Sequence, residues 1–97
     1  MLILITYDVN TATPEGRKRL NKLAKVCVDY GQRVQYSVFE CIVDPAQYVQ
    51  LKKTISTIID KEKDSIRFYL LGKNWNRRIE HLGKNETYHP TDDLFII

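Results

Sequence analysis

The fold of this chain is decided by the stretch Arg33-Val34-Gln35-Tyr36-Ser37-Val38-Phe39-Glu40-Cys41-Ile42-Val43. Its β-branched and aromatic residues favour extended backbone. Alternation predicts that Val34, Tyr36 and Val38 share one face of a strand, with polar residues between them on the other. The stretch can be one bent strand or a very tight hairpin, and periodicity alone leaves both open.

The flanking segments alternate between strand and helix character. Asp8 closes an apolar run that reads as a central, buried strand. Thr13 and Pro14 are typical of a helix start, and Gly31 of a helix stop. The expected elements are a strand at residues 2–7, a helix at residues 14–30, a helix opened by Asp44-Pro45, and a strand at residues 65–71 ended by Gly72. If residues 33–43 form a hairpin, this order predicts an α+β, ferredoxin-like βαββαβ domain.

Length and composition indicate one small domain. The chain has 97 residues, and a core of that size is marginal, so oligomerisation is a reasonable expectation. We expect a core at residues 1–72 and an extension at residues 73–97. The net charge of +3 permits a polyanionic partner without requiring one.

The two cysteines and the N-terminus indicate the compartment. Cys27 and Cys41 lie in apolar segments without metal-like spacing, which is typical of buried reduced thiols in a reducing cytosol. The N-terminal apolar run lacks a basic lead and soon reaches Asp8, so we expect neither a signal peptide nor a membrane span. The prediction is a cytoplasmic protein with no membrane partner.

The last residues, Asp93-Leu94-Phe95-Ile96-Ile97, have the character of a short strand. An apolar terminal strand needs a sheet edge with which to pair. A partner subunit would offer one, which predicts an extra C-terminal strand that pairs across a homodimer.

Asp8 is the first candidate for chemistry, because it ends a strand beside the start of a helix. Arg17 and Arg19 flank the apolar stripe of that helix. A carboxylate that holds a cation and guanidinium groups that hold phosphate suit phosphodiester chemistry. The plainer interpretation is that Asp8 only caps a turn and the arginines are solvated. A single carboxylate binds Mg²⁺ poorly, since this ion usually takes one or two carboxylates and fills its other positions with water and phosphate. A symmetric dimer would bring two copies of Asp8 together.

Several other residues receive plainer interpretations. Trp75 and its basic neighbours fit either contact with a nucleic-acid backbone or, for Trp75, packing against a partner subunit. Tyr36 and Tyr69 are expected to be core or interface aromatics. The expected surface or solvated groups are His81, His89, Glu40, Glu62 and Asp64.

Taken together, these motifs resemble the CRISPR-associated protein 2 family, the small subunit of the spacer-acquisition machinery. The resemblance is carried by Tyr7-Asp8, by Arg17 and Arg19, and by the Arg-Val-Gln-x-Ser-Val-Phe-Glu run at residues 33–40. It covers nearly the whole chain, and the stretch at residues 72–83 looks like the version found in type I-C systems. The resemblance implies a ferredoxin-like homodimer whose C-terminal strand crosses to the partner's sheet.

The resemblance also implies site residues. Asp8 of both subunits would bind Mg²⁺, for which Mn²⁺ would substitute. The positions tied to catalysis would be Asp8, Tyr7, Arg17, Arg19, Arg33, Ser37 and Phe39. The nucleic-acid-binding residues expected from the arginines of the motif are Arg17, Arg19 and Arg33. The basic residues around Trp75 add Lys73, Arg77 and Arg78 to this expectation.

Three functions fit these expectations. The first is a CRISPR-associated, Mg²⁺-dependent endonuclease for double-stranded DNA or single-stranded RNA that takes part in spacer acquisition. The second is a non-catalytic scaffold that grips duplex DNA beside the CRISPR integrase, its expected partner. The third is a stand-alone ribonuclease toxin of the same fold. A basic surface serves all three, so the sequence separates them poorly.

Overall fold

A tight hairpin resolves the ambiguity of residues 33–43. In the computed structural model, which describes residues 1–83, β2 spans Gly31–Gln35 and β3 spans Val38–Ile42. Tyr36 and Ser37 form the turn between them. The turn places Tyr36 at the tip, 92% exposed, so the predicted shared face with Val34 and Val38 was wrong at Tyr36.

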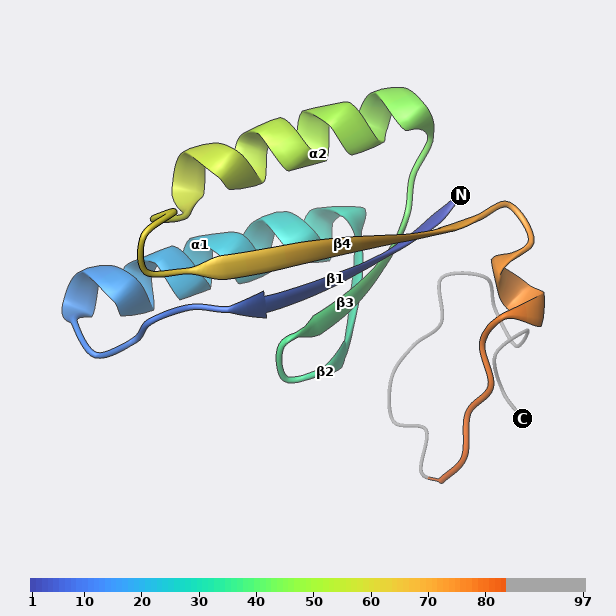
Figure 1. The fold of residues 1–97 in the computed structure, drawn as a ribbon, viewed down its shortest axis with the longest axis horizontal. Coiled ribbons are helices and arrows are strands. Elements are labelled where there is room, and N and C mark those ends of the chain that lie inside the picture. Colours follow the sequence, from blue (N-terminus) through green and yellow to red (C-terminus); the bar gives the residue numbers. More distant parts are fainter. Residues whose placement is uncertain (84–97) are drawn as a thin grey trace.

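The described elements occur in the order predicted from the sequence. They are β1 (Leu2–Asp8), α1 (Pro14–Tyr30), β2, β3, α2 (Pro45–Ile58), β4 (Ser65–Gly72) and a short 3₁₀ helix, η1 (Trp75–Arg77). The strand order is β2-β3-β1-β4, and each neighbouring pair is antiparallel. The ferredoxin-like, α+β prediction is confirmed (Figure 1). The strand predicted at residues 93–97 and the surface position predicted for His89 lie outside the described residues.

Each α-helix begins at a side-chain N-cap. Thr13 Oγ1 accepts a hydrogen bond from the Gly16 amide at 3.1 Å, ahead of Pro14 at the first helical position. Asp44 and Gln47 form a reciprocal capping box at the start of α2. Neither helix within residues 1–83 is long and apolar enough to cross a membrane.

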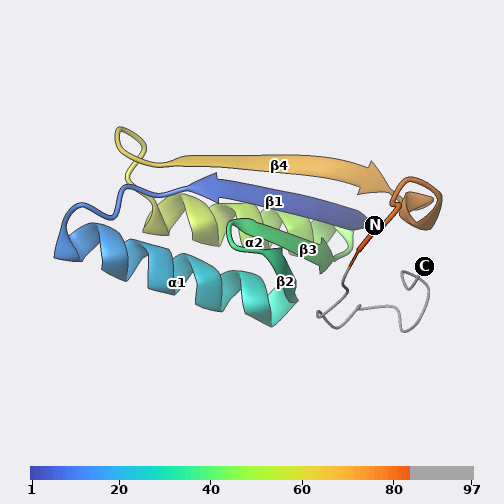
Figure 2. The same ribbon diagram turned by 90° about the horizontal axis from the view of Figure 1, so that it is seen from below.

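Both helices lie on one side of the sheet, and the hydrophobic core fills the space between (Figure 2). Alternate residues of β1 point into it, because successive side chains of a strand face opposite sides. The buried residues of this core are Ile3, Ile5, Tyr7, Leu23, Cys27, Phe39, Cys41, Val43, Leu51 and Ile55. The thiols of Cys27 and Cys41 are free and buried, as predicted, and burial raises both pKa values to about 12.

The other side of the sheet, here called the open face, is covered by neither α1 nor α2 (Figure 2). At one end Trp75 closes over Leu2, with Ile42, Leu71 and Ile79 packed against the pair. Trp75 is only 9% exposed, so it packs within its own chain. The rest of this face leads along β1 to Asp8.

Two of the charges predicted to be solvated are not. Glu40 is only 7% exposed, because its partner residues Leu4 and Gln32 flank it within the sheet. The side chain of Asp64 has no exposed surface, because it is enclosed by an ion pair with Arg19. Those two predictions were wrong. The prediction of exposure holds for Glu62.

Candidate active site

Asp8 ends β1 on the open face. The pleat separates it from Tyr7, which points into the core, and its register partner is Ser65 at the start of β4. Asp8 is exposed. A carboxylate at a strand end, free of helix cover, can therefore meet a ligand from solvent.

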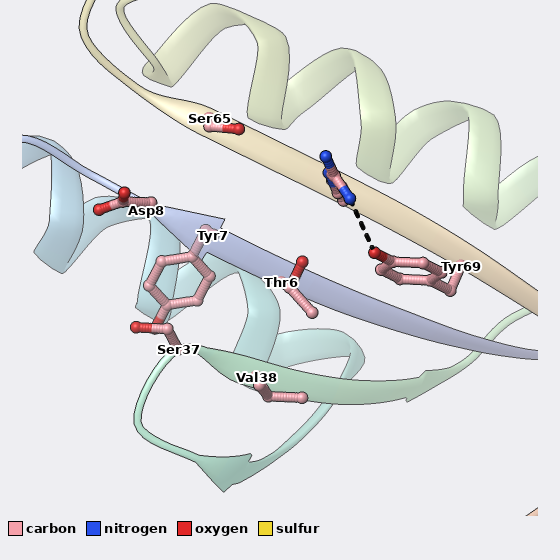
Figure 3. A pocket seen from close by; sticks show the side chains of 8 residues that line it. Thr6, Tyr7, Asp8, Ser37, Val38, Ser65 and Tyr69 are labelled. Carbon is pink, nitrogen blue, oxygen red and sulfur yellow. Dashed lines mark hydrogen bonds between the residues drawn. The ribbon is translucent and has the colours of Figure 1, made fainter.

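A shallow depression of about 350 Å³ surrounds this carboxylate (Figure 3). Three strands contribute to it, because β1 lies between β3 and β4. Its lining residues are Thr6, Tyr7, Asp8, Ser37, Val38, Ser65, Arg67 and Tyr69. The lining thus offers one carboxylate, several hydroxyls and one guanidinium, a set that suits a phosphate ester.

Arg67 and Ser65 are site residues that sequence reasoning missed. Arg67 pairs with Thr6 across β1 and β4, and its Nη1 donates to the Tyr69 hydroxyl at 3.3 Å. The hydrogen bond to Tyr69 raises the pKa of Arg67. The signal was present, since Ser65, Arg67 and Tyr69 alternate with apolar residues along the strand and so share one face.

The structure places Tyr7 and Phe39 in the core. Tyr7 is 6% exposed and Phe39 is fully buried, with their rings 6.0 Å apart and 25° from parallel. The Tyr7 hydroxyl donates to the Tyr36 carbonyl oxygen at 3.2 Å, and the Tyr7 amide donates to the Ser37 carbonyl oxygen at 3.1 Å. Tyr7 thereby anchors the hairpin turn and holds Ser37 beside the depression (Figure 3).

The three arginines of the predicted site are distributed over two elements. Arg17 on α1 is exposed and donates from Nη1 to the Thr11 carbonyl oxygen at 3.3 Å. Arg19 on the same helix is paired with Asp64. Arg33 lies on β2, two strands away from β1, with its guanidinium 5.2 Å from the centre of the Phe39 ring. None of the three lines the depression at Asp8 within the described part of the chain.

The basic residues after β4 lie at the other end of the sheet from Asp8. Asp8 pairs with Ser65, whereas Leu2 pairs with Gly72. Six residues of strand separate these ends, which is about 20 Å. Lys73 and Arg77 are exposed there, and Arg78 donates from Nη1 to the Leu71 carbonyl oxygen at 3.1 Å. They follow Gly72, so they lie beyond the end marked by Leu2.

The side chains around Asp8 determine whether this site could bind a metal ion. Residues 1–83 contain no group of three or more His, Cys, Asp or Glu side chains that could hold one. Asp8 is the single acidic residue that lines the depression, and no described histidine joins it. Mg²⁺ often takes only one or two carboxylates and fills its other positions with water and phosphate oxygens. The donor set therefore fits a hydrated cation that shares its shell with a substrate.

Comparisons with known proteins show which family this chain resembles. The family "CRISPR associated protein Cas2" matches residues 1–79. A relative from Nitratidesulfovibrio vulgaris, named CRISPR-associated endoribonuclease Cas2, is 54% identical over 99% of this chain and 94% of its own length. One from Halalkalibacterium halodurans, named CRISPR-associated endonuclease Cas2, is 53% identical over 97% of this chain and 98% of its own.

A solved structure gives the same answer for the fold. The crystal structure of Streptococcus pyogenes Cas2 at pH 6.5 superposes with a TM-score of 0.75 and 67% identity. The match covers 86% of this chain and 100% of the streptococcal one.

Proposed function

The chain belongs to the CRISPR-associated protein Cas2 family, and on that premise we propose that it is a metal-dependent endonuclease acting in CRISPR defence. Relatives over half identical to it are named endoribonuclease and endonuclease. The reaction is hydrolysis of a phosphodiester bond, in single-stranded RNA or double-stranded DNA. Its expected cellular role is spacer acquisition beside the CRISPR integrase.

The observation that carries the proposal is the exposed carboxylate of Asp8 at a strand end with phosphate-compatible neighbours. Hydroxyls of Thr6, Ser37 and Ser65 and the guanidinium of Arg67 line the same depression. The hydroxyls can donate to phosphate oxygens, and the guanidinium can balance their charge. These groups would orient the substrate, while the buried rings of Tyr7 and Phe39 hold the backbone on which the site is built.

Mg²⁺, or Mn²⁺ in its place, would be held by Asp8. When bound, such a cation supplies Lewis-acid chemistry, because it lowers the pKa of water and balances charge on the phosphate. One chain contributes a single carboxylate here, so we propose a homodimer in which both copies of Asp8 serve one cation. Without the cation the two carboxylates would repel.

The test compares cleavage by the wild type and by Asp8→Ala on duplex DNA and single-stranded RNA, with Mg²⁺ and with a chelator. We expect cleavage by the wild type with metal only, and none by the variant. Asp8→Asn, which keeps the shape of the side chain, is the matched control for folding. If both variants cut as fast as the wild type, Asp8 carries no chemistry and the endonuclease proposal fails.

The second candidate is a scaffold that grips duplex DNA beside the integrase without cutting it. It is favoured by one observation, that exposed basic side chains lie far from Asp8, as Lys73 and Arg77 do. A scaffold binds DNA whether or not a metal is present. Retained DNA binding with no cleavage of either substrate, in wild type with Mg²⁺ or Mn²⁺, would favour this function.

A further inference from the structure

The carboxylate of Asp64 is enclosed by four donors of its own chain. Oδ1 accepts from the Asn10 amide at 3.1 Å and from Arg19 Nη2 at 3.3 Å. Oδ2 accepts from Arg19 Nε at 2.8 Å and from the Asp60 amide at 2.9 Å. A carboxylate has about four acceptor positions, so this one is fully used inside the chain.

These hydrogen bonds fasten the backbone on both sides of Asp8. Asn10 follows Asp8 by two residues, in the loop between β1 and α1. Ser65, which follows Asp64 directly, is the register partner of Asp8. The carboxylate at residue 64 therefore ties the strand that pairs with Asp8 to the loop that leaves it.

The backbone of the same loop also packs closely against α1 at Gly16. A Cβ at this position would overlap the Asn10 carbonyl oxygen and lie 3.0 Å from the Asn10 carbonyl carbon. Close approach, rather than backbone conformation, explains the glycine in the first turn of α1. The loop after Asp8 is thus held between a helix and an ion pair.

The ion pair is charged at neutral pH. Burial raises the pKa of Asp64, but the hydrogen bonds from Arg19 and from the amides of Asp60 and Asn10 outweigh it, so the net pKa is lowered. The hydrogen bond to Asp64 raises the pKa of Arg19. The side chain of Arg19 is 17% exposed and that of Asp64 is not exposed at all. If Arg19 moved to a phosphate, it would leave an enclosed carboxylate without its partner, which is unfavourable.

From this geometry we infer that Asp64 and Arg19 are positioning residues for Asp8, and that Arg19 acts through Asp64 rather than by binding phosphate. The inference rests on the proposed function for the role of Asp8. It separates two arginines of one helix: Arg17 remains exposed and contacts only the Thr11 carbonyl oxygen among the hydrogen bonds described, whereas Arg19 is committed to the loop.

The first experiment measures the salt dependence of binding to a short DNA duplex. A residue that contacts phosphate contributes about one unit to the slope of log Kobs against log salt. We expect Arg19→Gln to keep the wild-type slope, while Arg17→Ala, which removes the same charge, lowers it by about one. A drop of about one unit in Arg19→Gln would show a phosphate contact and overturn the inference.

The second experiment is a double-mutant cycle of Arg19→Gln and Asp64→Asn. In Asp64→Asn, the side-chain NH₂ would face N–H donors where the carboxylate had accepted hydrogen bonds. In Arg19→Gln, the carboxylate would lose its charged partner. Both single variants should therefore loosen the loop after Asp8. We expect kcat to fall by about tenfold to a hundredfold in each single variant, with KM unchanged. The kcat of the double variant should be no lower than that of the less active single variant. Independent, multiplying effects would overturn the inference. Arg19→Lys keeps one charged donor, and its kcat should fall between that of the wild type and that of Arg19→Gln. If Asp64→Asn does not fold, this graded order replaces the cycle as the test, and a kcat of Arg19→Lys no higher than that of Arg19→Gln would overturn the inference.

Amide hydrogen exchange supplies a measurement that does not depend on activity. The Asn10 and Asp60 amides should exchange at least about tenfold faster in Arg19→Gln and in Asp64→Asn. In both variants these two amides lose the ordered Asp64 carboxylate as their hydrogen-bond acceptor. Unchanged exchange at both amides would overturn the inference. If the wild type cleaves nothing, the proposed function fails, while exchange and salt slope still decide whether Arg19 is committed to Asp64.

Discussion

The two ends of the open face are built from the same strands and differ in almost everything else. At the Leu2 end, Trp75 covers the sheet and the surrounding side chains are apolar. At the Asp8 end, the sheet is uncovered and the lining is polar. Packing stabilises the first end, and ligands can reach the second. Substitutions at the Leu2 end should therefore change stability, and those at the Asp8 end should change activity.

The largest effect is expected from Asp8→Ala. Several kcal/mol of transition-state stabilisation depend on a bound cation, so cleavage should fall by at least about a thousandfold. The free energy of unfolding should stay within about 0.5 kcal/mol of wild type, because the side chain is exposed. Single-turnover cleavage and thermal unfolding check the two halves. A loss of folding in Asp8→Ala would contradict the division between the two ends.

Trp75→Ala tests the Leu2 end of the open face and should lower stability while leaving cleavage unchanged. Removing a buried aromatic side chain costs about 3–5 kcal/mol, and the melting temperature of a domain of this size should fall by more than about 10 °C. Cleavage per folded molecule should be unchanged at low temperature. Leu82→Ala is the matched control, because Leu82 is 95% exposed. A Trp75 variant as stable as this control would show that the cluster with Leu2 contributes nothing.

Glu40 lies between the two ends, opposite Leu4, and offers a smaller and pH-dependent effect. Burial raises its pKa above the ordinary value of 4.5. The folded state therefore holds a proton that the unfolded state has released, and stability falls as pH rises from about 4.5 through the raised pKa. Glu40→Gln should remove this slope and increase stability at pH 7.

The gain at pH 7 follows from the direction of the shift, because glutamine has no carboxylate that must stay buried and charged at that pH. The gain should shrink toward pH 4, where the carboxyl is protonated in both states. Urea unfolding at a series of pH values measures it. A Glu40→Gln variant less stable than wild type at pH 7 would mean that the carboxylate has a favourable partner.

Alternation and caps were enough to predict both helices, β1 and β4, whereas they left residues 33–43 open between one bent strand and the hairpin of β2 and β3. Thr13-Pro14 and Asp44-Pro45 begin helices where the sequence predicted them. Gly31 was read as a helix stop, and it does follow α1. Its φ of −174° is ordinary extended backbone. Glycine fits this position because it has no side chain, whereas a Cβ there would overlap the Glu40 carbonyl oxygen.

The site was harder to predict, because neighbours along a strand face opposite sides and pairing across strands is not visible locally. Asp8, Tyr7 and Ser37 were predicted and do line the depression. Tyr7 and Phe39 belong to the same motifs and lie in the core. Asp64 was read as solvated because its partner, Arg19, lies 45 residues away in the sequence. The type I-C-like character of the tail and the strand exchange at residues 93–97 stay predictions.

The smallest expected effect concerns which end of the molecule touches nucleic acid. Arg17 is exposed on α1, the helix that follows Asp8, and Arg77 is exposed beyond the Leu2 end. If duplex DNA spans both ends, Arg17→Ala and Arg77→Ala should each lower the slope of log Kobs against log salt by about one. Lys53→Ala removes the same charge from α2, which lies on the same side of the sheet as α1 (Figure 2). Because Lys53 is near the middle of α2 rather than at either end of the open face, this variant should leave the slope unchanged. Equal losses in all three variants would mean that the duplex recognises only net charge. A loss confined to Arg17→Ala would restrict the contact to the end that carries Asp8.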